Sequence, residues 1–347
     1  MTSRGFILAS LRHYRRIHIA VALGVAVATA VLTGALLVGD SVRGSLRELT
    51  LERLGRIDSA LVAGKMFREA LAEEIAASAE FKQHFTNAEP AILMTGTLQS
   101  GSGERTRRAT SISIIGCRET FWSLQTTPAG ATWVAPAAAP WSISLADNEI
   151  ALTESVAREL AVEAGDPVLL RIPIAGAIPA DSPLGEKSET SLSRSFTVKS
   201  VAPASSFARF GLAPSQNLPR NAFVPLPTLQ HLLEQPGKAN VVLVATENSN
   251  APSDDAAQRA LRQALKPHLD DYGLRVERIE SPNQCLQVSA NQLVLPDAVV
   301  SAVEKAFADS PLQQVVTYLA NTIAAGSGES QRKIPYSTIT GVDSTAA

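Results

Sequence analysis

The sequence predicts an α+β domain, built from mixed layers of helices and strands, that lies outside a membrane and follows one transmembrane α-helix. Three observations predict this class: a long apolar segment near the N-terminus, arginines concentrated on one side of that segment, and alternating strand-like and helix-like segments over the rest of the chain. Such alternation needs more than one layer, because helices and strands must bury their apolar faces against each other.

The apolar segment runs from Ile17 to Gly39 and contains no Asp, Glu, Lys or Arg. About 20 helical residues at about 1.5 Å each match the roughly 30 Å hydrocarbon core of a bilayer. A buried helix of a water-soluble domain seldom runs so long without a polar face. A cleaved signal peptide has a shorter apolar region of about 7–15 residues. We therefore predict a permanent transmembrane helix over residues 17–39, with the buried helix and the cleaved signal as alternatives.

The charges around this segment predict its orientation. Residues 1–16 contain no acidic residue, whereas charges of both signs follow Gly39. The basic residues of the N-terminus are Arg4, Arg12, Arg15 and Arg16. Because basic residues stay on the cytoplasmic side of a membrane, we expect a cytoplasmic N-terminus and an extracytoplasmic remainder.

Small residues recur four apart along the predicted span, at Ala22, Ala26, Ala30 and Gly34. A ribbon of small residues lets helix backbones approach closely in lipid. We hypothesise that this ribbon packs against other helices; the simpler explanation is that alanine is common in membrane spans.

The helical pattern continues past the apolar segment. Over residues 40–57 the apolar side chains, among them Leu46, Leu49 and Leu54, recur on one side, and arginines and glutamates occupy the other. We predict an amphipathic stalk helix that extends the span beyond the bilayer.

Further along, residues 90–99 and 107–116 flank a glycine-rich turn and predict a β-hairpin. Residues 68–81 predict one helix. Residues 148–172 predict a strand, a helix and a second strand, with Thr153 as N-cap and Gly165 as the stop of the helix. Residues 171–195 predict a long exposed loop.

The composition excludes several classes of function. A net charge of −2 gives no basic surplus for nucleic acid. There is no Walker A loop and no G-x-G-x-x-G motif after a strand. The five histidines have no Cys, Asp or Glu at ligand spacing, so we expect no metal site. Because no cofactor or catalytic motif is present either, we expect no cofactor and no catalytic residue. Whether Cys117 and Cys285 pair stays open.

Several segments carry a resemblance to a known family. They are Ile115-Gly116 followed by Phe121 to Leu124, the "LTESVAREL" and Gly165-Asp166 element, and the "FVPLPTLQHLL" segment that begins at Phe223. These segments resemble the MacB/FtsX-like family of ABC transporter permeases, and in particular their periplasmic core domain. The resemblance covers about residues 5–245 and rests on packing and turn positions.

The resemblance implies a permease subunit in the inner membrane of a bacterium, with the exterior domain in the periplasm. Such permeases are dimers, so the partners would be membrane lipid, a second permease copy, a cytoplasmic ABC ATPase that binds the ATP, and an exterior substrate or partner that is unknown. The exterior domain would be an interaction and lever module and not an enzyme. Leu46, Leu49 and Leu54 would then couple the stalk to the domain.

One departure from the family is plain. Its permeases usually have four spans, whereas no later stretch of this chain has 18 apolar residues in a row. The sequence therefore favours a fragment or truncated form; the alternative is a stand-alone, single-pass anchored binding or scaffold protein. The predicted parts are a cytoplasmic N-terminus (1–16), the transmembrane helix (17–39), the stalk (40–57), the core domain (58–250) and its α/β continuation (251–347).

Overall fold

A computed structural model describes residues 3–101, 103, 106–125, 141–173, 191–203, 207–213, 217–246, 255–280, 284–290, 295–326 and 332–342. The helices are α1 (Ser3–His13), α2 (Arg15–Leu54), α3 (Ala70–Ala77), α4 (Ala79–Lys82), η2 (Glu119–Leu124), α5 (Glu154–Leu160), η3 (Phe207–Arg209), α6 (Leu226–Leu232), α7 (Asp255–Ala264), η4 (Leu269–Tyr272) and α8 (Asp297–Ala306). The strands are β1 (Ile57–Arg68), β2 (Asn87–Ser100), β3 (Arg107–Cys117), β4 (Glu149–Thr153), β5 (Pro167–Pro173), β6 (Ser191–Ala202), β7 (Asn221–Pro225), β8 (Lys238–Ala245), β9 (Leu274–Ile279), β10 (Cys285–Ala290), β11 (Val315–Ala325) and β12 (Arg332–Val342).

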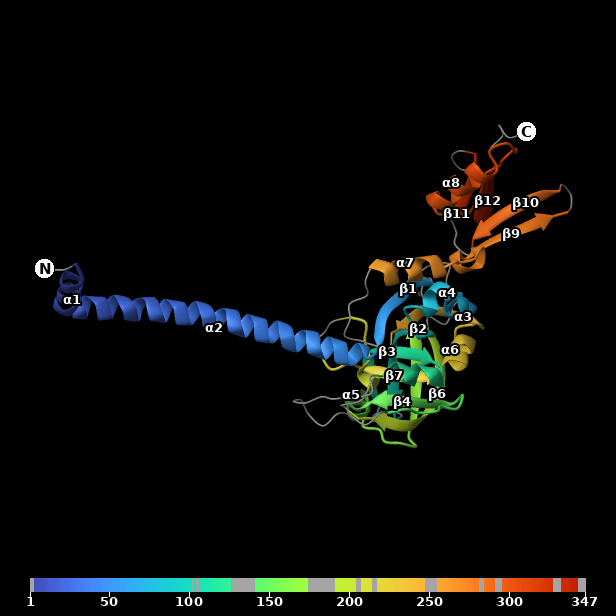
Figure 1. Ribbon diagram of the computed structural model, residues 1–347. Helices are drawn as coiled ribbons and strands as arrows, with labels where there is room; N and C mark the ends of the chain where they lie inside the picture. The colour runs from blue at the N-terminus through green and yellow to red at the C-terminus, as the bar shows by residue number, and fades with distance from the viewer. Residues whose placement is uncertain are drawn as a thin grey trace.

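Helix α2 contains both the predicted span and the predicted stalk as one uninterrupted helix of 40 residues (Figure 1). It is the single helix, within the part of the chain that the structure describes, that is long and apolar enough to cross a membrane. Thr29 is accommodated in the apolar stretch because its hydroxyl donates to the carbonyl of Val25, one turn back, at 2.8 Å. The helix ends at Leu54, before the predicted end of the stalk at residue 57, because Ile57 already begins β1.

The domain at the end of α2 is built on an eight-stranded sheet in the order β1-β8-β2-β3-β7-β4-β6-β5. Strand β5 also pairs with β2, so the six strands β2-β3-β7-β4-β6-β5 close into a ring. Strands β8 and β1 extend the sheet outside this ring. Strands β2 and β3 form the predicted antiparallel hairpin. The predicted α+β fold with mixed layers is confirmed.

Three apolar clusters hold the layers together. The first is formed by the ring strands with α5 and α6. The second lies around η2 and η3 and is rich in aromatic rings. The third lies between the β1 and β8 extension and helices α3, α4 and α7. Gly116 on β3 permits the close approach of α6, since a Cβ atom there would stand 2.7 Å from Leu229 Cδ2.

Helix α7 follows the predicted domain boundary at residue 250 and contributes Ala257 and Ala264 to the third cluster. The predicted division of the chain into five parts stays a prediction. Beyond α7, the pairs β9–β10 and β11–β12 form separate two-stranded sheets. They lie with α8 on the far side of α7 from the ring (Figure 1). Leu274 is the last buried apolar residue of the described chain.

Three local predictions were wrong, and that of Thr153 as N-cap was confirmed for its position only. The helix over residues 68–81 is divided into α3 and α4, because Ser78 leaves the helical conformation and caps α4 by accepting from Phe81 N–H. Helix α5 ends at Leu160, before Gly165. Thr153 is the N-cap residue of α5, as predicted, although its side chain makes no cap hydrogen bond. Residues 171–173 and 191–195 lie in strands β5 and β6 and not in a loop; the rest of that segment lies outside the described residues.

Candidate functional site

The candidate site is the junction at which α2 joins the domain (Figure 1). Along the predicted stalk, Leu46, Leu49 and Leu54 are half-buried, whereas Val42, one turn earlier, is 49% exposed. The apolar side of the stalk therefore becomes covered only in the last turns of α2. Helix α2 contacts η3 there.

Gly55 follows the last residue of α2 and lies where the surrounding atoms leave no room for a side chain. Its backbone has φ +60° and ψ −123°, a conformation that residues with a side chain adopt only under strain. A Cβ atom at this position would lie 2.5 Å from the carbonyl oxygen of Leu124 and 2.8 Å from Cε2 of Phe207. The backbone of the junction is thus pressed between the end of η2 and η3.

Arg56 fastens the chain to the domain immediately after the glycine. Its N–H donates to the carbonyl of Leu124 at 2.7 Å, and its carbonyl accepts from Thr246 N–H at 3.2 Å. Its guanidinium donates from Nε to the carbonyl of Thr246 at 3.1 Å and from Nη2 to Thr86 Oγ1 at 3.1 Å. One residue therefore joins η2, the end of β8 and the start of β2, with no slack between helix and sheet.

Arg53, in the last turn of α2, is the buried residue of that helix, with 5% exposure. Its Nη2 donates to the carbonyl of Asn217 at 3.0 Å. Burial, and next the positive charge of Arg209, lower the pKa of Arg53 from its ordinary value, and Glu52 partly offsets this. Glu52 also lies 3.8 Å from Arg209. Arg53 keeps its charge at neutral pH, so its burial is supported by the carbonyl and the carboxylate.

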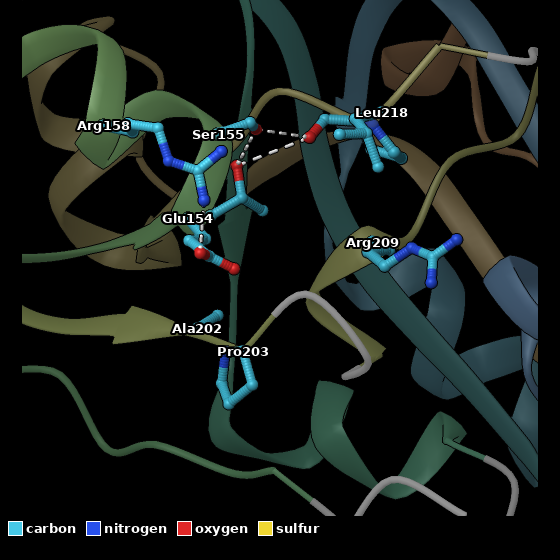
Figure 2. A pocket seen from close by; sticks show the side chains of 9 residues that line it. Glu154, Ser155, Arg158, Ala202, Pro203, Arg209 and Leu218 are labelled. Atoms are coloured by element: carbon cyan, nitrogen blue, oxygen red, sulfur yellow. Dashed lines mark hydrogen bonds and ion pairs between the residues drawn. The ribbon is translucent and has the colours of Figure 1, made fainter. Parts of the chain in front are cut away.

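The segment that receives Arg53 is itself held by hydroxyl groups on the edge of α5. Ser155 Oγ donates to the carbonyl of Pro219 at 3.1 Å, and Thr153 Oγ1 accepts from the N–H of Asn221 at 3.1 Å. The Thr153 hydroxyl is engaged with β7, which explains why it makes no cap hydrogen bond to α5. Figure 2 shows Ser155 close to this segment and Arg209 across from it.

Asn221 holds the second partner of the junction, η3. This side chain is 2% exposed, and its Nδ2 donates to the carbonyls of Ala208 and Phe210 at 2.8 and 2.7 Å. Buried carbonyls need such a donor. Phe207 then both contacts the Gly55 position and packs on Phe121, with ring centroids 5.4 Å apart. The junction is therefore continuous with the aromatic cluster over the sheet.

The hollow drawn in Figure 2 adjoins this junction. Its volume is about 90 Å³, below the 300–1,000 Å³ of ordinary small-molecule sites. Residues of α5, Pro203, Arg209 and Leu218 line it. Among the residues that the structure describes, no group of three metal-ligating side chains comes together.

One buried carboxyl group has a perturbed pKa, which could signal catalysis. Glu89 on β2 is 3% exposed and accepts from Thr120 Oγ1 at 2.7 Å. Burial raises its pKa above the ordinary value, and the Thr120 hydroxyl and the charge of Arg118 partly oppose this. Glu89 lines neither the hollow of Figure 2 nor a second, more open hollow of about 580 Å³ between α5 and β6. We interpret it as part of the polar network that joins β2 to η2.

The predicted site residues lie in different environments. The ribbon of Ala22, Ala26, Ala30 and Gly34 lies in the apolar stretch of α2, none of which is buried, so its packing role stays a prediction. The coupling role of Leu46, Leu49 and Leu54 also stays a prediction, although they lie beside the junction. The two cysteines are free: Cys117 is buried on β3 and Cys285 is exposed on β10.

Sequence reasoning missed Arg53, Gly55, Arg56 and Asn221. A glycine directly after the last helical residue was a usable signal, because glycine is common where helices end. Asn221 gave no signal, since its role depends on carbonyls that are distant until the chain folds.

Comparison with known protein families identifies the family to which the chain belongs. The profile of the MacB-like periplasmic core domain matches residues 19–264, which is more than half of the chain. The match begins within the apolar part of α2 and ends with α7, so it includes the helix, the junction and the ring. The chain belongs to the family of MacB-like periplasmic core domains, and the resemblance in the sequence is confirmed.

Solved structures give a more distant likeness. The periplasmic region of MacB from Actinobacillus actinomycetemcomitans is 13% identical, with a TM-score of 0.36 over 72% of this chain and 94% of that chain. The extracellular domain of the noncanonic ABC-type transporter YknZ from Gram-positive bacteria is 12% identical, with a TM-score of 0.33 over 66% of this chain and 97% of that chain. No curated protein matches the chain.

The first prediction concerns Gly55. In Gly55→Ala the new Cβ meets the Leu124 carbonyl, and the backbone strain alone costs about 1–3 kcal/mol. We expect the junction to open, and trypsin to cut the full chain in detergent faster after Arg53 and Arg56. Gly44→Ala is the matched control, because a Cβ atom there meets nothing within 4 Å. Equal cleavage rates in the two variants would contradict a tight junction.

The second prediction concerns Glu89. Its pKa is higher in the folded chain, so the protonated form stabilises the fold below about pH 4.3, and this stabilisation is lost as pH rises through the folded pKa. Glu89→Gln stays neutral and can still accept from Thr120. We expect the Tm of this variant, relative to the unaltered chain, to rise between about pH 4 and pH 7. The exposed control Glu163→Gln should show no such trend. A falling difference would show that the carboxylate form is favoured by the fold.

Proposed function

We propose that the chain is a permease subunit of an ABC-type transporter and that its exterior domain is an interaction and lever module. In this proposal the N-terminus lies in the cytoplasm, α2 crosses the inner membrane of a bacterium, and the domain lies in the periplasm. A separate cytoplasmic ATPase binds and hydrolyses ATP, and the chain itself catalyses no reaction. Membership of the MacB-like periplasmic core domain family and the arginines of residues 1–16 support this arrangement.

The observation that carries the lever role is the junction itself. A helix of 40 residues is about 60 Å long and is a stiff element. Only Gly55 and Arg56 separate its last residue from β1, and both are held by the domain. A tilt of α2 in the membrane is therefore passed to the sheet and is not lost in a linker, as a lever requires.

Assembly would use the membrane part of α2. Since lipid tails are as apolar as the helix, close backbone packing favours association there. In the proposal, the ribbon of Ala22, Ala26, Ala30 and Gly34 packs against a second permease copy or other spans. The exposure of the whole apolar stretch leaves this face available.

The third prediction tests assembly. Ala26→Leu with Ala30→Leu adds bulk on the ribbon, and we expect less dimer and less ATPase to be recovered when the tagged chain is extracted from cell membranes in mild detergent. Val21→Leu with Val25→Leu, on the other side of α2, should leave recovery unchanged. Native mass and ATP hydrolysis are the measurements. Unchanged recovery in the alanine variant would contradict the packing role.

The fourth prediction tests the lever. A fluorophore on the exposed Cys285 reports the environment of the domain, while buried Cys117 stays unlabelled. We expect ATP to change the fluorescence of the complex. A short Gly-Ser insertion between Leu54 and Gly55 should preserve assembly and ATP hydrolysis but abolish this response. The same insertion after Gly103, in the β2–β3 turn, should preserve all three.

Two outcomes would contradict the proposal. An ATP response that survives the insertion at the junction would show that α2 does not drive the domain. Absence of any co-purifying ATPase would favour a membrane-anchored binding or scaffold module.

A further inference from the structure

Helix α1 is an element that neither the lever nor the domain uses. It ends at His13, and a single residue, Tyr14, separates it from α2; Tyr14 has φ −95° and ψ 20°. Figure 1 shows α1 turned away from the axis of α2, at the end farthest from the domain. The chain therefore places a separate short helix where the apolar span begins.

One side of α1 is apolar and exposed. Phe6, Ile7 and Leu11 have exposures of 68%, 56% and 50%. At 100° per residue these positions fall within an arc of about 140°. Tyr14, which is 50% exposed, continues this side at the start of α2. Aromatic residues with a polar tip are enriched at the level of lipid headgroups.

The basic residues at this end of the chain lack an acidic counterpart. Arg12, Arg15 and Arg16 are exposed, and the first acidic residue of the chain is Asp40. At about 1.5 Å per residue, Asp40 lies about 36 Å from Arg16 along α2, on the other side of the apolar stretch. The counter-charge of these arginines must therefore come from outside this end of the chain.

We propose that α1 lies in the plane of the cytoplasmic leaflet, with its apolar side in the acyl boundary, and that Arg12, Arg15 and Arg16 bind the phosphate groups of anionic lipids. The inference rests on the proposed membrane crossing and orientation of α2. Two features select lipid as the occupant: α1 is continuous with the membrane-crossing helix, and its charge is opposite to that of anionic headgroups.

The length of the span supports the in-plane position. Residues 17–39 already match the thickness of the hydrocarbon core, so α1 is not needed to cross it. If α1 stood upright as an extension of α2, Phe6, Ile7 and Leu11 would lie in water. Lying flat, α1 buries these side chains, at about 25 cal/mol per Å² of apolar surface removed from water, while the arginines reach the phosphates.

The fifth prediction measures depth in the full chain, in phosphatidylcholine vesicles that also contain phosphatidylglycerol. Single labels are placed by Ile7→Cys or Ala9→Cys on a Cys285→Ser background. Cys117 stays unlabelled, because it is buried and burial raises the pKa of its thiol. Positions 7 and 9 point about 200° apart. We expect the label at position 7 to be blue-shifted and quenched by brominated lipid, and the label at position 9 to be quenched by aqueous iodide.

Anionic recognition is measured with the same label. Brominated phosphatidylglycerol should quench the label at position 7 in preference to brominated phosphatidylcholine, and each arginine should contribute about fivefold to this preference. The triple change Arg12→Gln, Arg15→Gln and Arg16→Gln should remove the preference. Arg43→Gln with Arg47→Gln, beyond the other end of the apolar stretch, is the matched control and should retain it.

Other results would overturn the inference. Equal aqueous quenching at positions 7 and 9 would place α1 in water. A blue shift without quenching by brominated lipid would place α1 against protein. Protease protection of the domain, measured on the same vesicles, reports whether α2 crosses the bilayer. If α2 does not cross, the proposed function fails as well; if it crosses and α1 lies in water, this inference alone fails.

Discussion

The structure depends on the absence of free backbone between α2 and β1. Gly55 is compressed between the Leu124 carbonyl and the Phe207 ring. Arg56 is hydrogen-bonded to Leu124 at the end of η2 and to Thr246 after β8. A longer or looser connection would leave the helix and the domain as two independent bodies. The close contact instead makes the position of the domain a function of the position of the helix.

This constraint explains why several polar groups are buried around the junction. Arg53 and Asn221 are 5% and 2% exposed, and burying such groups is costly unless their donors find acceptors. Both donate to backbone carbonyls outside the sheet: Arg53 to Asn217, and Asn221 to Ala208 and Phe210. Each side chain thus gives a hydrogen bond to carbonyl groups outside the sheet and ties their segments to the junction.

The sequence predicted what depends on local pattern. The continuous apolar segment predicted α2, and alternating patterns predicted the β2–β3 hairpin and the α+β class. Closure of the ring through β2 and β5 could not be predicted, because it joins strands whose pairing depends on the packing between them. The Thr153 hydroxyl illustrates the same limit: Thr153 is the N-cap residue of α5, as a local rule predicts, but Asn221, a residue distant in sequence, engages its hydroxyl. The local pattern places Arg53 on the polar side of the stalk, whereas the fold buries it.

The unbroken hydrogen bonding of α2 has one more mechanical meaning. A hinged or glycine-linked rod transmits displacement but swivels freely about its own axis. A helix whose end is clamped at Gly55 and Arg56 resists this swivelling, so it can deliver torque as well as tilt. Because the clamp contacts η2, η3 and the start of β2 as well as β1, such a torque would reach both the closed ring and the open margin of the sheet. Rotation of α2 about its axis would therefore act on the ring and on its β8–β1 extension together.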